Sequence, residues 1–187
     1  MSYTIRPAQA QDFDAITRIY ADAVAHGTAS FELNVPDKGE MLRRHMALVD
    51  QGYPYIVLED DSGVQGYAYV GPYRARPAYR WVVENSVYLD SNVRGNGYGK
   101  ALLVELINAC EKLGFRQMIA VIGDSANKPS IAVHKTCGFH LTGTLTNMGW
   151  KHGHWLDTVL MQLALGGDGP ADMDSLPGKM FEMTKTP

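Results

Sequence analysis

The chain has 187 residues, a length that suits one α/β domain with a well-filled core and is short for two. Apolar residues make up 45% and charged residues 20%, and the net charge of -3 gives a pI near 6.0. Such a chain has no general attraction to nucleic acid or anionic membranes, so neither is expected as a partner. Without a signal-peptide pattern or an apolar run near the roughly 20 residues of a membrane span, the sequence predicts a cytoplasmic protein with reduced cysteines.

Apolar spacing in the first half of the chain alternates between the periods of helices and strands. In chain order it predicts a strand at 3–6, a helix at 12–25, a loop at 26–32, a helix between Asp37 and Gly52, and strands at 55–59, 65–71 and 82–89. Asp37 is the expected N-cap of the second helix, with Glu40 three residues on as its capping-box partner. Residues 60–63, Asp-Asp-Ser-Gly, predict the turn of a hairpin.

The second half of the chain continues this alternation. It predicts a helix from about Gly97 to Gly114, a strand at 115–122, a helix from Asn127 to Gly138, and strands at about 140–148 and 156–163 joined by a turn at 151–154. Asn127 is the expected N-cap of its helix. Pro129 fits in the first turn, where no backbone N–H is needed. Residues 166–187 are rich in Gly, Pro and acidic residues and predict a flexible tail, so residues 1–165 form the single expected domain.

The stretch from Glu84 to Lys100 leads from a strand to a helix through three closely spaced glycines, Gly95, Gly97 and Gly99. The first turn of a helix has unpaired N–H groups and the positive end of the helix dipole. Glycine lets the backbone approach a ligand closely or adopt positive φ, and Arg94 adds a cation. We therefore expect this loop to bind a diphosphate.

Three diphosphate-binding patterns compete for this loop, and spacing separates them. A Walker loop is excluded because Lys100 is followed by alanine and position 94 is not glycine. A dinucleotide fingerprint is excluded because the glycines alternate and no acidic residue ends the next strand at the expected place. The third pattern, Arg-x-x-Gly-x-Gly, is met by Arg94, Gly97 and Gly99.

Further short motifs flank this loop. They are Val83–Tyr88, Asn127–Ser130 with His134 and Gly138-Phe139, and Gly149–Gly153 before Trp155-Leu156-Asp157. In this order, the sequence resembles the GNAT superfamily of acetyl-CoA-dependent N-acetyltransferases, and within it the phosphinothricin and methionine sulfoximine acetyltransferases, over roughly residues 3–163. The resemblance implies an α/β (α+β) GNAT fold, with a mixed, mostly antiparallel sheet flanked by helices and two splayed parallel central strands. It also implies acetyl-CoA as co-substrate and a homodimer.

The resemblance places the acetyl donor along the central strand and the glycine loop. The residues expected to bind acetyl-CoA are Val87, Tyr88, Leu89, Arg94, Gly95, Asn96, Gly97, Tyr98, Gly99, Lys100, Asn127 and Ser130. The strand backbone would hold the pantetheine arm, and the N–H of Val87 or Tyr88 would polarise the thioester carbonyl.

Two titratable residues are candidates for catalysis. Glu84, three residues before the pantetheine strand, is the expected general base if its surroundings raise its pKa. His134, one turn after Ser130, is the expected general acid for the leaving thiolate. Each residue type also occurs in purely structural roles, Glu facing solvent and His packed in a helix. Direct attack in a ternary complex is favoured, because neither cysteine lies in the glycine loop or beside Glu84.

The amine substrate is expected to contact residues from three segments of the chain. The expected substrate-binding residues are Phe31, Glu32, Arg74, Arg76, Tyr79, Glu84, Asn85 and Ser86, with Asn85 and Ser86 facing one cavity. An arginine fork pairs well with a carboxylate or phosphinate group. His152 and His154 lack the further ligands of a zinc site, so we expect a turn there and no metal.

The predicted activity is acetylation of the α-amine of a small amino-acid analogue, such as methionine sulfoximine, methionine sulfone or phosphinothricin. Two alternatives stay open at this point. A protein N-terminal acetyltransferase would use the same donor machinery with an open peptide groove. A CoA-binding regulatory module would bind the donor without turnover.

Overall fold

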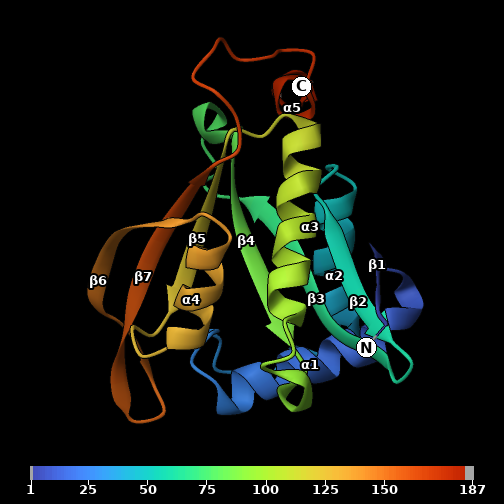
Figure 1. Cartoon of the computed structure of the whole chain (residues 1–187), viewed down its shortest axis with the longest axis vertical. Helices are drawn as coiled ribbons and strands as arrows, with labels where there is room; N and C mark the ends of the chain where they lie inside the picture. The colour runs from blue at the N-terminus through green and yellow to red at the C-terminus, as the bar shows by residue number, and fades with distance from the viewer. Residues whose placement is uncertain (1, 184–187) are drawn as a thin grey trace.

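The computed structural model describes residues 2–183, which form one sheet covered by helices (Figure 1). In chain order the strands and helices are β1 (Thr4–Pro7), α1 (Phe13–His26), α2 (Lys38–Val49), β2 (Tyr55–Asp60), β3 (Gly63–Pro72), β4 (Val82–Leu89), α3 (Tyr98–Leu113), β5 (Gln117–Gly123), α4 (Lys128–Thr136), β6 (His140–Lys151), β7 (His154–Ala164) and α5 (Leu176–Met183). The strand order is β1-β2-β3-β4-β5-β7-β6, and all neighbours are antiparallel except β4 and β5. The predicted fold class is confirmed.

Helices cover the two faces of this sheet through their apolar sides. Figure 1 shows α3 and α4 in front of the sheet and α2 behind it. Leu102, Leu103 and Leu106 of α3 are fully buried against β2–β5, while Phe13 and Ile16 of α1 are fully buried on the other face. Burying each such side chain contributes about 1.5–3 kcal/mol, so these apolar sides hold the helices in place.

The parallel pair β4 and β5 separates part-way along its length. Their pairing runs from Val82 and Gln117 to Asn85 and Ala120. Beyond this point β4 continues beside β3 and β5 continues beside β7, and Figure 1 shows the lower ends of β4 and β5 moving apart. Facing backbone groups on diverging strands cannot pair with each other, so the splay creates a gap with free hydrogen-bonding capacity.

Helix starts follow the predicted caps, with one difference. The Asp37 carboxylate accepts a hydrogen bond from the Glu40 N–H at 2.8 Å, and the Asn127 side chain accepts one from the Ser130 N–H at 3.3 Å. The Glu40 side chain does not act as the predicted capping-box partner but accepts hydrogen bonds from Arg43 and Arg44. Charged donors three and four residues on make stronger hydrogen bonds than a neutral N–H.

The β6–β7 turn lies at the predicted residues, 151–154, and the flanking strands extend further toward it than predicted. His152 and Gly153 both adopt positive φ, at 50° and 79°. Two such residues form the turn that matches the twist of a hairpin, so the strands continue up to Lys151 and resume at His154.

The segment predicted to be a flexible tail contains helix α5. Leu176 and Met180 pack against the main core, and the Tyr53 hydroxyl lies 3.8 Å from the Met180 sulfur. Arg116 donates a hydrogen bond to the Gly169 carbonyl at 2.5 Å. The boundary at residue 165 and the mobility of the tail stay predictions, and residues 184–187 lie outside the described part. Between residues 2 and 183, no helix is both long and apolar enough to span a membrane.

Candidate functional site

A hollow opens where β4 and β5 diverge. Its walls come from both strands, from the start of α4 and from the loop between α1 and α2. The lining residues are Ala29, Asn85, Ser86, Val87, Tyr88, Ala120, Val121, Ile122, Gly123, Asn127, Ser130 and His134. The structure thus brings together Asn85, Ser86, Val87, Tyr88, Asn127, Ser130 and His134 from the predicted site, whereas Leu89 lies further along β4, paired with Gly66 of β3.

Strand β4 directs its side chains alternately to the two faces of the sheet. Ser86 and Tyr88 pair with Tyr69 and Tyr67 of β3, whose rings pack on the α1 and α2 face. By the same alternation Glu84 lies on that face, while Asn85 and the two residues at alternate positions after it lie on the α3 and α4 face. Asn85 and Ser86 therefore both line the hollow, and they reach it from opposite faces of β4.

Asn85 and His134 form a hydrogen-bonded chain on the α4 side. The Asn85 amide nitrogen donates to the Ile119 carbonyl at 3.1 Å, and its oxygen lies 3.0 Å from His134 Nε2. His134 Nδ1 lies 2.8 Å from the Ser130 carbonyl, so both ring nitrogens face oxygen acceptors. Two acceptors favour the protonated ring. Burial outweighs this effect and lowers the pKa of His134.

Glu84 lies on the other side of β4. Its side chain is half-buried, and burial raises the pKa of the carboxyl group while the positive charge of Arg74 opposes the shift. Tyr69, next to it on this face, hydrogen bonds with the Ser86 hydroxyl, and burial raises the pKa of its phenol. Glu84 is thus a carboxylate on this face whose surroundings favour the uptake of a proton.

The glycine loop has the geometry of an anion site. Gly95 and Gly97 adopt positive φ, at 87° and 82°, which is costly for any other residue. The first helical hydrogen bond of α3 runs from the Ala101 N–H to the Gly97 carbonyl at 3.0 Å, so the N–H groups before it have no acceptor within the helix. Arg94 is exposed, 3.8 Å from Asp22. A diphosphate fits this loop, because the N–H groups of the first helical turn, the helix dipole and a cation meet there.

The remaining loop residues differ in solvent exposure. Asn96, Gly97 and Lys100 are exposed, whereas Gly99 is buried. The Tyr98 ring is also buried, and its hydroxyl donates to Asp60 at 3.0 Å. Tyr98 can therefore contact a ligand of the loop through its backbone, while its side chain ties α3 to the β2–β3 hairpin.

Comparison with known proteins identifies the family of this chain. Residues 5–160 match the acetyltransferase (GNAT) domain. The chain is 48% identical over 162 residues to the phosphinothricin N-acetyltransferase of Alcaligenes faecalis, covering 87% of this chain and 82% of that protein. It is 39% identical over 166 residues to an L-methionine sulfoximine/L-methionine sulfone acetyltransferase of Pseudomonas paraeruginosa, covering 88% of this chain and 96% of that protein. A GNAT superfamily phosphinothricin acetyltransferase from Sinorhizobium meliloti, crystallised with AcCoA, superposes with a TM-score of 0.91 at 46% identity, over 95% of this chain and 97% of that one. The chain belongs to the GNAT acetyltransferase family.

In this GNAT acetyltransferase, the loop before β4 brings Arg74, one of its three arginines, to Glu84. Arg74 is close enough for its charge to affect the Glu84 carboxyl group, and its guanidinium lies 5.2 Å from the centre of the Tyr73 ring. Tyr79 packs edge-on against the same ring. Arg76 lies exposed at the start of the short turn Pro77–Tyr79. The structure therefore groups Arg74 with Glu84 and leaves Arg76 apart.

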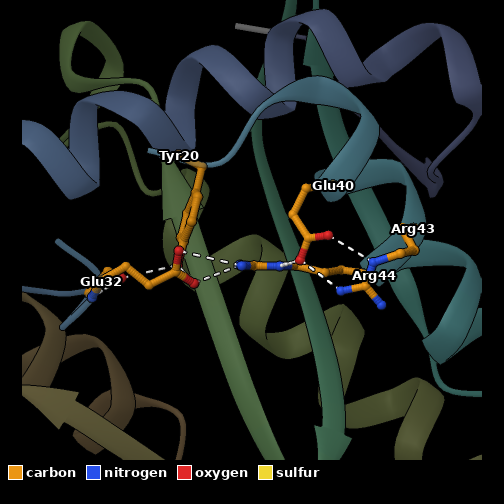
Figure 2. Close-up of polar contacts among 6 residues, drawn as sticks. Tyr20, Glu32, Glu40, Arg43 and Arg44 are labelled. Atoms are coloured by element: carbon orange, nitrogen blue, oxygen red, sulfur yellow. Dashed lines mark hydrogen bonds and ion pairs between the residues drawn. The ribbon is translucent and has the colours of Figure 1, made fainter. Parts of the chain in front are cut away.

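The loop between α1 and α2 is fixed by a polar network that sequence analysis did not find. Figure 2 shows Glu32 between Tyr20 and Arg44, with the Arg44 guanidinium also facing Glu40. The Tyr20 hydroxyl donates to Glu32 at 3.0 Å, and Arg44 donates to Glu32 at 2.6 Å and to Glu40 at 2.7 Å. Glu32 is thus held by side chains of the protein itself. The i, i+4 spacing of Glu40 and Arg44 was the sequence signal that could have predicted part of this network.

His152 and His154 lie in and beside the β6–β7 turn. His152 Nε2 lies 3.2 Å from the Gly27 carbonyl, and His154 Nδ1 lies 3.2 Å from the His152 carbonyl. The acetyltransferase has no group of three or more His, Cys, Asp or Glu side chains suited to a metal ion within residues 2–183.

Proposed function

We propose that the enzyme transfers an acetyl group from acetyl-CoA to the α-amine of a small amino-acid analogue of the methionine sulfoximine, methionine sulfone or phosphinothricin type. The observation that carries this proposal is the half-buried Glu84 with its raised pKa beside the gap between β4 and β5. The relatives named for such substrates share up to 48% of their aligned residues with this chain.

Donor binding is assigned to the glycine loop and the diverging part of β4. The N–H groups at the start of α3 and the cation of Arg94 bind the diphosphate. The backbone of Val87, on the edge of β4 that faces the gap, holds the amide arm of the donor and polarises its thioester carbonyl, whereas the Tyr88 backbone is directed to β3. Acetyl-CoA supplies an activated acetyl group whose carbonyl carbon is open to attack.

Acceptor binding is assigned to the α1 and α2 face. Glu84 takes a proton from the ammonium group, which is almost wholly protonated at neutral pH, and so frees the lone pair of the amine. Arg74 pairs with the carboxylate of the amino acid. Its opposing effect on the Glu84 pKa means that a bound carboxylate, by neutralising Arg74, makes Glu84 a stronger base.

In the acetyl transfer itself, the new C–N bond forms as the C–S bond breaks. The amine attacks directly in a ternary complex, and the nitrogen then releases its second proton to solvent as the amide forms. The departing thiolate takes a proton from His134 on the opposite side of β4, and His134 regains a proton from solvent. Burial lowers the pKa of His134, which makes its protonated form a stronger acid and reduces the fraction that is protonated near neutral pH. Asn85 and Ser130 hold the imidazole in place.

The test is thiol release from acetyl-CoA with methionine sulfoximine, methionine sulfone, phosphinothricin, other free amino acids and short peptides. Turnover limited to the amino-acid analogues is expected. Turnover of peptides alone would favour the protein N-terminal acetyltransferase. Binding of acetyl-CoA without any turnover would favour a regulatory module.

We further propose a homodimer formed through the hairpin β6–β7. Edge strand β6 and its partner expose Leu141, Leu145, Met148, Trp150 and Trp155. An apolar surface of this kind on an edge hairpin is typical of an interface. Light scattering should report a dimer for the wild type. Trp155→Ser should weaken this dimer, whereas the control Met46→Ser, at an exposed position of α2, should leave it intact. A monomeric wild type would contradict the proposal. The cytoplasmic location stays a prediction.

A further inference from the structure

The Phe31 ring lies on two glycines from different strands. A Cβ atom on Gly149 of β6 would lie 2.6 Å from Phe31 Cδ2, and a Cβ atom on Gly123 of β5 would lie 2.9 Å from Phe31 Cε1. Real Cβ atoms essentially never approach other atoms below 3.0 Å. The missing side chains at both positions therefore form a seat for this ring. A larger residue at Gly149 has to displace the ring alone, whereas a Cβ at Gly123 would also lie 2.4 Å from the Thr28 carbonyl oxygen.

The backbone on either side of Phe31 is fixed independently of this seat. Lys151 is buried and donates a hydrogen bond to the Ser30 carbonyl at 2.6 Å. The Ser30 hydroxyl lies 3.0 Å from the Tyr20 hydroxyl, and Glu32 is held by Arg44 (Figure 2). Because the neighbouring residues are anchored, a blocked seat moves the ring away from the sheet instead of shifting the loop.

The displaced ring would enter the space proposed for the amine. Val121 precedes Gly123 by two residues, so it shares its face of β5 and is exposed there beside the hollow. Ile119, on the same face, pairs with Glu84. One face of β5 therefore runs from Gly123 past Val121 to Ile119. Phe31 lies at one end of this face, and the proposed base Glu84 lies beside the other.

We propose that Gly123 and Gly149 are specificity-determining positions, because they set how deeply Phe31 sits and hence how long a side chain the amine can carry. The inference rests on the proposed function. Neither glycine has a side chain to contact substrate, so Gly149 acts through Phe31, and Gly123 acts through Phe31 and the Thr28 carbonyl.

The experiment compares Gly149→Ala with Gly143→Ala. Both glycines lie in β6, but a Cβ on Gly143 has nothing within 4 Å, which makes it a matched control. Gly149→Ala should raise the KM for methionine sulfone about tenfold, with a smaller rise for the shorter 2-aminobutyrate and an acetyl-CoA KM unchanged within about twofold. Phe31→Leu in the Gly149→Ala background removes the clashing ring and should restore the KM of the Phe31→Leu single variant.

Two results would overturn the inference: kinetics of Gly149→Ala that match Gly143→Ala, or a KM defect that persists in the double variant. A crystal structure of Gly149→Ala tests the seat without any substrate. A displaced Phe31 ring supports the inference, and an unmoved ring overturns it. If the wild type acetylates none of the amines, the proposed function fails, and the ring position still decides whether the seat exists.

Discussion

Replacing Glu84 by Gln tests the proposed base while keeping the size of a half-buried side chain. General base catalysis contributes about 10²–10⁴ in rate, or about 2.7–5.4 kcal/mol of the barrier. The neighbouring hydroxyls of Tyr69 and Ser86 are poor substitutes, because the Tyr69 pKa is raised further by burial. His134 lies on the opposite face of β4. We therefore expect the upper half of the range, a loss of about 10³ or more in kcat.

The pH profile separates this role from a structural one. Only the carboxylate accepts a proton, so kcat/KM should rise with pH as Glu84 ionises, and burial moves this rise above the range of an exposed glutamate. The rise should vanish in Glu84→Gln. In Arg74→Met it should move to higher pH, because the lost cation no longer lowers the Glu84 pKa.

The assay is thiol release at saturating acetyl-CoA with methionine sulfone, from pH 5 to 9. Glu105→Gln, on the exposed side of α3, is the control for removal of a carboxylate and should behave as wild type. The reasoning is refuted by a Glu84→Gln enzyme that keeps its rate within about tenfold. An Arg74→Met profile displaced to lower pH would refute the electrostatic argument alone.

Three other substitutions give expected outcomes. His134→Gln should lower kcat about 10²-fold with the acetyl-CoA KM nearly unchanged in steady-state kinetics; a normal kcat would remove His134 as the acid. Gly66→Ala places a Cβ 2.9 Å from the carbonyl oxygen of the neighbouring strand and should cost about 1–3 kcal/mol in urea unfolding, unlike Gly143→Ala. Asp12→Asn loses a hydrogen-bonded pair with Arg6 and should cost about 1–3 kcal/mol at neutral pH. Because Arg6 lowers the pKa of Asp12, this stability is lost as pH falls through the folded-state pKa, so wild type and variant should converge in acid; a constant difference would contradict the assignment.

Features encoded by neighbouring residues were the ones that the sequence could predict. The caps at Asp37 and Asn127 each depend on a side chain and an N–H three residues away, and both are found. Positive φ at Gly97 likewise follows from the local turn into α3. The sequence could also predict that Glu84 and Asn85 lie on opposite faces of the sheet, because the strand period of two requires no tertiary information.

Contacts between distant residues could not be predicted in the same way. Asn85 reaches His134 across 49 residues, and Glu32 is held by Arg44 because two helices meet at that loop. Such pairs depend on how the helices pack on the sheet, which no local pattern specifies. The same holds for Phe31, whose seat joins glycines of two strands that are separated along the chain.

The division of β4 into two faces makes the enzyme modular. Odd positions from Asn85 onward contact the α3 and α4 layer, and even positions from Glu84 onward contact the α1 and α2 layer. With the proposed assignment of donor and acceptor to these two faces, a change in one layer is expected to alter acceptor binding without disturbing donor binding. Directed evolution toward new amines is expected to accumulate substitutions in α1, α2 and their connecting loop, and to leave the glycine loop and α4 untouched.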